Sequence, residues 1–150
     1  MTVTVKLSGF AELERELEQL EKLATRKAVA RRALKKAAEP LAGIANSMAP
    51  VGATGDYARS FVYSTKLNKR QTGLHRKMFR NDRAAIEGFV GTNDPAGVQQ
   101  EFGNLNHGPQ PALRPAWQQD QNAMLERLKA ELWADLQKTI ARANARAARG

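Results

Sequence analysis

Apolar positions recur every three or four residues in three parts of the chain, at residues 10–24, 25–48 and 115–143. This spacing places the apolar side chains on one side of a helix, so it predicts three amphipathic helices. Pro40 lacks an amide donor and crowds the preceding turn, which predicts a kink or a restart in the second helix. The stripes comprise Phe10, Leu13, Leu17, Leu20 and Ala24; then Ala30, Leu34, Ala37, Leu41, Ile44 and Met48; then Trp117, Gln121, Met124, Leu128, Leu132, Leu136, Ile140 and Ala143.

Strand patterns lie between and before these helices. Thr2–Leu7 alternates β-branched with other residues, and the segments Tyr57–Thr65 and Ile86–Val90 are rich in aromatic and β-branched residues. The basic stretch 66–83 between the last two is predicted to be a long hairpin or loop, with an extra strand at Leu74–Phe79 as an alternative. We therefore expect an α+β fold, in which a small, mostly antiparallel sheet packs against an N-terminal helical pair and a long C-terminal helix.

Turn residues divide these elements, and no linker separates two domains, so a single domain over 1–150 is expected. Pro50 ends the second helix, and Gly52 and Gly55 can reverse the chain, which predicts a helix-to-sheet hinge. This stretch does not follow the G-x-x-x-x-G-K-[ST] spacing of a phosphate loop. The Gly-, Pro- and Asn-rich region before Pro115 should be irregular, except for one turn of helix at Ala96–Phe102. Pro115 fits the first turn of the last helix, and the basic tail from about 143 is expected to be flexible.

The chain carries a net charge of +9, and its charged residues are grouped in separate acidic and basic segments. The segment 11–21 is acid-rich, 26–36 is basic, and the end after Asp135 carries only basic charges. Such blocks can contact phosphates or an acidic partner surface, although each is equally consistent with a solvated helix face. The block in the predicted loop consists of Lys66, Lys69, Arg70, Arg76, Lys77, Arg80 and Arg83.

The sequence contains few of the residue patterns that enzymes use for catalysis. The chain has no cysteine, which excludes disulfides, thiolate zinc sites and cysteine nucleophiles and fits a reducing cytoplasm. Its two histidines, His75 and His107, lie in polar surroundings, without a nucleophile-elbow motif or clustered metal ligands. No run approaches the roughly 20 apolar residues that span a bilayer, and the first residues do not resemble a signal peptide. We expect a soluble cytosolic protein that is not an enzyme and has no cofactor, metal or membrane partner.

Four segments, in this order, resemble a known family. "VKLSGFAELERELEQL", "APVGATGDYARSF", "FVGTN…QQEFGN" and "GPQPALRPAW" are similar to signatures of siphophage minor-tail or tail-completion proteins, also found in prophages and gene transfer agents. The chain departs from the pattern by one extra residue at Gly52-Ala53, by Gly97–Gln100 in place of a tyrosine-alanine pair, and by Ala112 in place of an aromatic residue. The matching positions are Ala49, Pro50, Val51, Thr54, Gly55, Ser60, Gly91, Thr92, Glu101, Phe102, Gly103, Pro111, Leu113, Arg114 and Pro115.

The resemblance implies a structural virion protein, made in the bacterial host cytoplasm. It implies a ring, usually six-fold, at the head-proximal end of the tail, which completes the tail and joins it to the head around the DNA channel. The implied partners are the head-side connector or stopper and the tail terminator or tail-tube proteins. An edge strand, Thr2–Leu7 or Tyr57–Thr65, is expected to extend the sheet of a neighbouring subunit.

The basic block at 66–83 would then face either DNA or an adjacent ring. If six subunits each held about three phosphates, the resulting log–log salt slope of about −16 would clamp the DNA. An acidic neighbouring ring is therefore the favoured partner. The rival hypothesis is a small basic nucleic-acid-binding protein that acts through phosphate contacts. Its usual marks, a helix-turn-helix pattern or stacking aromatic residues, are not found in the sequence.

Overall fold

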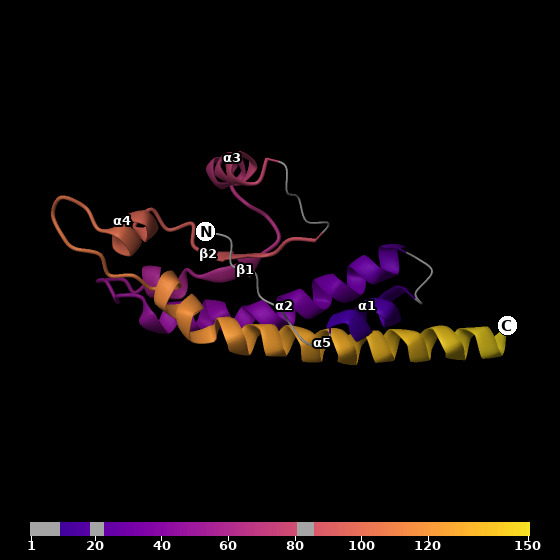
Figure 1. The fold of residues 1–150 in the computed structure, drawn as a ribbon. Coiled ribbons are helices and arrows are strands. Elements are labelled where there is room, and N and C mark those ends of the chain that lie inside the picture. The colour runs from indigo at the N-terminus through magenta and orange to yellow at the C-terminus, as the bar shows by residue number, and fades with distance from the viewer. Residues whose placement is uncertain (1–9, 19–22, 81–85) are drawn as a thin grey trace.

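The computed structural model describes residues 10–18, 23–80 and 86–150. It confirms an α+β fold in which helices predominate and two short strands pair antiparallel (Figure 1). The strand predicted at Thr2–Leu7 lies outside the described residues. In chain order the elements are α1 (Phe10–Glu18), α2 (Leu23–Met48), the 3₁₀ turn η1 (Tyr57–Arg59), β1 (Val62–Ser64), α3 (Lys69–Met78), β2 (Phe89–Gly91), α4 (Gly97–Phe102) and α5 (Leu113–Arg149).

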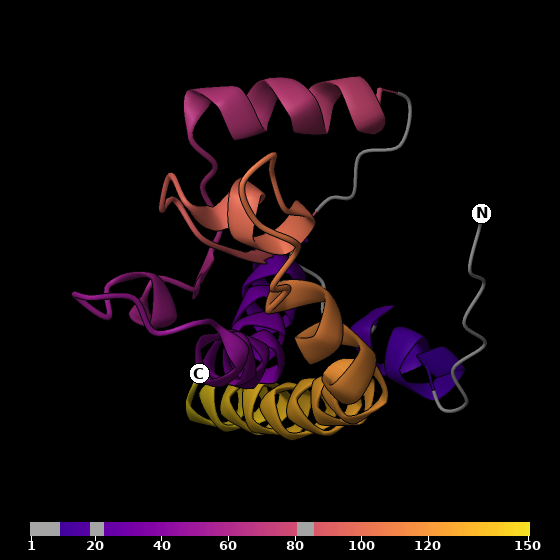
Figure 2. The same ribbon diagram turned by 90° about the vertical axis from the view of Figure 1, so that its left-hand side faces the viewer.

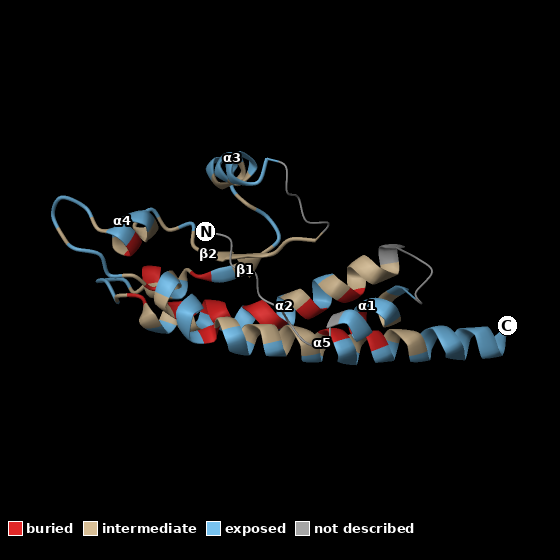
Figure 3. Cartoon of the chain, viewed as in Figure 1, coloured by how far each residue is buried: buried red, intermediate tan, exposed pale blue. Residues whose placement is uncertain are grey.

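The body of the molecule is the pair α2 and α5, which lie along one another, with α1 beside them (Figure 1). Buried residues follow the contact between these helices (Figure 3). One cluster joins Leu13 to Leu132 and Leu136 at the end where α2 begins, and a second surrounds Leu41 and Phe61 near the sheet. Alanines dominate the buried side of α2, and their small side chains let the two helices approach closely.

Helix α2 runs through Pro40 as one helix, so the predicted restart is wrong. Pro40 is exposed, as is Lys36, the residue one turn before it, whose carbonyl has no proline N–H to accept from. The buried stripe of α2 also differs from the predicted one. Ala37 and Leu41 are buried as expected, but Leu34, Ile44 and Met48 are only partly buried. The other buried positions are Val29, Ala33, Ala38, Ala42 and Ala45, because α2 is covered by α5 on one side and by the sheet on another.

The two predicted strands are confirmed in part: β1 lies within Tyr57–Thr65 and β2 begins near the end of Ile86–Val90, with Tyr63 opposite Val90. The expected start of the first strand at Tyr57 is wrong, since Tyr57–Arg59 is a 3₁₀ turn. Within the basic stretch Lys69–Met78 forms α3, so the predicted hairpin or loop is wrong for these residues, and Leu74–Phe79 is not a strand. This helix begins with a capping box, in which Asn68 and Gln71 exchange side-chain-to-backbone hydrogen bonds. Figure 2 shows α3 standing away from the helical pair, with the sheet between them.

The irregular region contains the predicted turn of helix, α4, and Pro115 lies in the first turn of α5 as predicted. Residues 143–149 belong to α5, and the flexibility of this tail stays a prediction. Alanine and arginine are strong helix formers, which explains why this exposed end remains helical. Of the helices in the described ranges, none has the length and apolar character that crossing a membrane requires.

Candidate interaction surfaces

Two motifs of the sequence meet where α4 approaches the start of α5. The carboxylate of Glu101 accepts hydrogen bonds from the backbone N–H groups of Ala112 (2.9 Å), Leu113 (3.1 Å) and Arg114 (2.9 Å). The first N–H groups of a helix have no partner within the helix, and a buried carboxylate satisfies three of them here. Glu101 therefore fixes the point at which α5 begins.

The protonation of Glu101 follows from these contacts. Burial raises its pKa, but the hydrogen bonds from Ala112, Arg114 and Leu113 and from the Arg114 side chain outweigh burial, so the pKa of Glu101 is lowered. The positive end of the α5 dipole lies at the same place and favours the charged form. Glu101 is thus an ionised helix cap.

Arg114 and Gly103 complete this joint. The Arg114 guanidinium donates to the Glu101 carboxylate (Nε, 3.2 Å) and to its backbone carbonyl (2.6 Å), and lies 4.8 Å from the Phe102 ring centre. Gly103 has φ +78°, and a Cβ there would come within 2.9 Å of the backbone nitrogen of Pro109. Glu101 and Phe102 therefore contact the start of α5, and Gly103 lies close to Pro109, where α4 and α5 meet.

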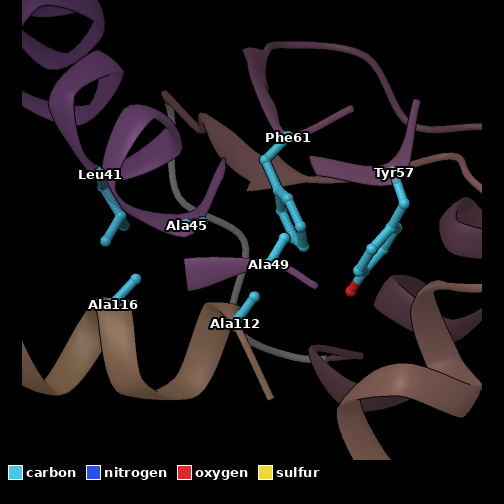
Figure 4. Close-up of a cluster of buried hydrophobic side chains, with 7 residues drawn as sticks. All are labelled: Leu41, Ala45, Ala49, Tyr57, Phe61, Ala112 and Ala116. Atoms are coloured by element: carbon cyan, nitrogen blue, oxygen red, sulfur yellow. The ribbon is translucent and has the colours of Figure 1, made fainter. Parts of the chain in front are cut away.

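The hinge after α2 places the aromatic residues of the core. Gly55 has φ +71°, and the Arg59 guanidinium donates to the carbonyl of Thr54 (3.0 Å) across the turn. Tyr57 and Phe61 then lie edge to face, 5.5 Å apart, and Figure 4 shows both beside Ala49 in the core. The predicted role of this segment, a helix-to-sheet hinge without a ligand, agrees with this geometry and remains a proposal.

Ser60 connects the hinge to the far end of β2. Its hydroxyl lies 2.6 Å from that of Thr92 and donates to the Tyr57 carbonyl (2.7 Å). Thr92 in turn accepts from the backbone N–H of Asp94 (3.0 Å), which begins the turn into α4. Ser60 and Thr92, both selected by the sequence motifs, thus meet, although 32 residues separate them.

The basic block forms one exposed surface on and around α3. At 100° per residue, Lys69, Arg70, Arg76 and Lys77 fall within about 120° of the helix circumference. These four residues, with Lys66 and Arg80, are exposed, and residues 66–80 contain no acidic residue. Arg83 lies outside the described residues. We call Lys69, Arg70, Arg76 and Lys77 the basic face.

The opposite side of α3 attaches it to the body. His75 lies against Phe79 and Phe89, with ring centres 5.0 and 5.3 Å away, and its Nε2 is 3.5 Å from Glu87. No residue of α3 is buried. The helix is therefore held at its edge and presents its basic face to the surroundings.

Sequence reasoning missed two ion pairs of the long helices, one within α5 and one between α2 and α5. Arg127 bonds to Asp120 and, through two nitrogens, to the carbonyl of Ala37 on α2 (3.0 and 3.2 Å). Arg32 bonds to both oxygens of Asp135 (2.7 and 2.9 Å), and this bond is the main reason that the pKa of Asp135 is lowered. The seven-residue spacing of Asp120 and Arg127, which puts both on one helix face, was the available signal.

Comparison with known protein families gave one match. A family model described as "Bacteriophage HK97-gp10, putative tail-component" matches residues 11–103, which is more than half of the chain. The chain therefore belongs to the HK97-gp10-like family and is a phage tail component, a part of the virion that contacts other virion proteins. The matched region covers α1 to α4 and ends at Gly103, before α5 begins. Neither the curated proteins nor the solved structures gave a match.

Proposed function

We propose that this tail component is one subunit of a closed ring at the head-proximal end of a phage tail. Residues 1–150 act in it as a single domain. The ring, six-fold in this proposal, completes the tail and joins it to the head around the DNA channel. Its neighbours are the head-side connector or stopper and the tail terminator or tail-tube proteins. The observation that carries the proposal is the family match over 11–103, continued by the tail-completion motif that ends at Pro115.

The joint between α4 and α5 supports a role based on shape. A ring subunit must hold its contact surfaces in fixed orientation, because small angular errors accumulate around a closed ring. Glu101 and Arg114 fix α4 against α5, while Ser60 and Thr92 fix the hinge against β2. These family positions serve as rigid joints in the proposal and bind no ligand.

An exposed strand edge forms one of the contacts between subunits in this proposal. Residues Thr2–Leu7 or Tyr57–Thr65 extend the sheet of a neighbour through main-chain hydrogen bonds. The second segment contains β1, whose Val62 is 54% exposed. Two-stranded sheets are marginal alone, so an added strand would stabilise both partners.

The basic face docks against an acidic surface of the adjacent ring. Six copies would present 24 cations on the basic faces alone, four from each subunit. Complementary charge would guide stacking and register, whereas grip on DNA would oppose its passage during ejection. Arg80 and Arg83 extend the same charged region in sequence.

A decisive experiment is deletion of the gene for this protein in the phage that encodes it, followed by electron microscopy. We expect full heads and separate tails that do not join, and rescue when the intact chain is supplied. Light scattering of the purified protein, alone and with neck proteins, then reports ring formation. Normal head-to-tail joining in the deletion would overturn the proposal.

Nucleic-acid binding is the second candidate, and the exposed basic face is the observation that favours it. Binding to non-specific duplex should be measured at 50 and 200 mM salt for the natural chain. A variant with Arg70→Gln and Lys77→Gln is compared with a control that has Lys35→Gln and Lys138→Gln, exposed cations on α2 and α5. Tight, salt-sensitive binding that only the first variant loses would favour DNA over an acidic ring.

A further inference from the structure

Helix α3 carries large apolar side chains on its solvent side. Leu74 and Met78 lie four residues apart, on adjacent turns, and are 54% and 75% exposed. Phe79, which directly follows, is 42% exposed although its ring lies against His75. We call Leu74, Met78 and Phe79 the apolar edge. Exposed apolar residues that gather in one short segment mark a contact surface more often than scattered single residues do.

The apolar edge adjoins the basic face. At 100° per residue, Leu74 lies about 40° around the helix from Arg70, and Met78 lies about 40° beyond Leu74. His75, which attaches α3 to the body, lies about 60° further on. The basic face and the apolar edge are therefore neighbouring parts of one exposed surface, and a partner that covers one also reaches the other.

The fold of this chain makes no use of that surface. No residue of α3 is buried, so the apolar edge adds nothing to the core. Figure 2 shows α3 on the far side of the sheet from α2 and α5, where a partner can approach it. A helix with apolar side chains at positions four apart, next to a charged side, is typical of helices that bind in an apolar groove of another protein. The exposed side of α3 has this pattern.

Three other partners explain the combination less well. Duplex DNA needs only the cations for contact with its phosphates and would leave the apolar edge in water. A helix that lies on a membrane buries a whole apolar face, whereas α3 offers only Leu74 and Met78 among its ten residues. A second copy of this chain has an apolar groove between α2, β2 and α5, but Arg114 and no acidic residue is among the described residues that line it. That groove would repel the basic face.

We propose that α3 docks as an amphipathic helix in an apolar groove, bordered by acidic residues, on the protein of the adjacent ring. The proposal rests on the ring assembly proposed above and adds an apolar contact to the docking of the basic face. Membership of a family of phage tail components agrees with a protein as the partner. Charge would guide the encounter, and burial of the apolar edge would slow dissociation.

The heads and tails expected to accumulate separately in the gene deletion provide the assay. Purified chain is added to them, and the concentration that gives half-maximal joining is measured. Leu74→Gln with Met78→Gln should raise this concentration at least about tenfold, because burial of one large apolar side chain changes an equilibrium by more than that factor. The swap Leu74→Met with Met78→Leu is the matched control, which keeps the apolar character and should join heads to tails like the natural chain.

The control separates the contact from the ring. Equal activity of the glutamine variant and the swap would overturn the contact and leave the ring standing, whereas normal joining in the deletion itself would remove both. Glutamine has a helix propensity close to those of leucine and methionine, so α3 should persist. A second variant, Leu74→Ala with Met78→Ala, favours the helix even more and must also lose activity. Full activity of this alanine variant would overturn the contact.

Binding measurements on the same variants test the other partners. The glutamine variant keeps every cation, so it should bind non-specific duplex at 50 mM salt as the natural chain does. Weaker binding to duplex would overturn the proposal, because the apolar edge would then belong to a DNA contact. Vesicles of phosphatidylglycerol and phosphatidylethanolamine are the membrane probe. Binding to these vesicles by the natural chain that the glutamine variant loses would equally overturn it, in favour of a lipid surface.

Discussion

The side-chain amide of Asn46 pairs with both backbone groups of Phe61. Its nitrogen donates to the Phe61 carbonyl (3.0 Å), and its oxygen accepts from the Phe61 N–H (2.9 Å). A side chain on α2 therefore takes the place of a neighbouring strand at the residue just before β1. Phe61 is buried at 3% exposure, so its backbone groups would otherwise lack partners.

Asn46→Ala should lower the free energy of unfolding by about 2–3 kcal/mol, because it leaves a buried N–H and a buried carbonyl unpaired. Ser47→Ala is the control, since Ser47 is exposed and bonds only to the carbonyl of Ile44 within its own helix. The control should change stability by less than about 0.5 kcal/mol. Urea unfolding followed by circular dichroism measures both. Equal effects would mean that the Asn46–Phe61 pair contributes nothing.

Glu101 gives a prediction that depends on pH. Its folded pKa lies below the usual glutamate value of about 4.3, so its contribution is fully present above that pH and is lost as the pH falls through the folded pKa. Glu101→Gln, which keeps the shape but removes the charge, should cost about 1–3 kcal/mol at pH 7. The difference from the natural chain should shrink below about pH 4.

Urea unfolding at a series of pH values from 7 to 3 tests this. Glu126→Gln, an exposed change on α5, controls for loss of one negative charge. A cost for Glu101→Gln that stays constant over this range would show that the ionised carboxylate is not what stabilises the start of α5.

Two glycines should respond to alanine in opposite directions. Gly103 adopts φ +78° and ψ 174°, and a Cβ would press on the backbone of Pro109, so Gly103→Ala should cost more than about 2 kcal/mol. Gly43 lies inside α2 with open space around the Cβ position, so Gly43→Ala should add about 0.5–1 kcal/mol. Thermal unfolding midpoints should therefore move in opposite directions. A stabilising Gly103→Ala would contradict the rigid turn.

Helices α1, α2 and α5 could be predicted because their signals are local. Apolar spacing locates α1, α2 and α5, and Pro50 and Pro115 mark an end and a beginning. The stripe of α2 was predicted less well, because which side is buried depends on neighbours that the spacing does not identify. Ala45 is fully buried since both α5 and the sheet cover that region.

The prediction of a loop or strand for α3 failed for a different reason. Its apolar residues, such as Leu74 and Met78, remain exposed and give no clear helical stripe. The readable signal was the Asn68–Gln71 capping box, a pattern of two residues three apart. Likewise, the motif search selected Glu101 and Arg114 but did not reveal that one caps the helix of the other. That relation depends on the path of the chain between them.

The ion pair Arg127–Asp120 within α5 and the ion pair Arg32–Asp135 between α2 and α5 should differ in energy. Arg127 is only 31% exposed and its partner Asp120 is 5% exposed, whereas Arg32 is 51% exposed. Arg127→Met would leave a buried carboxylate unpaired and should cost about 3–5 kcal/mol. Arg32→Met should cost no more than about 1 kcal/mol. Chemical denaturation measures the free energy of unfolding of both variants. Similar losses of stability would contradict the prediction that the more buried ion pair contributes more.

The cap of α3 should control the basic face without affecting the rest of the fold. Since α3 buries no residue, a helix of ten residues depends strongly on its capping box. Asn68→Ala should shift local helix opening by about 1 kcal/mol, so amide exchange over 71–78 should become about fivefold faster. The global unfolding midpoint should stay unchanged. Asn122→Ala, an exposed position on α5, is the control and should leave exchange in α3 as it is.

Asn68→Ala also distinguishes binding that depends on net charge from binding that depends on the positions of the four cations of the basic face. Asn68→Ala keeps every lysine and arginine, so a ligand that requires only net positive charge should bind as before. A partner surface that fits the ordered basic face should bind more weakly, since the four cations must be ordered again at an entropic cost. Titration of the assembled adjacent ring, or of duplex DNA, against both proteins measures this difference. Unchanged exchange in Asn68→Ala would show that contacts of His75 with Phe79 and Phe89, rather than the cap, hold α3 in place.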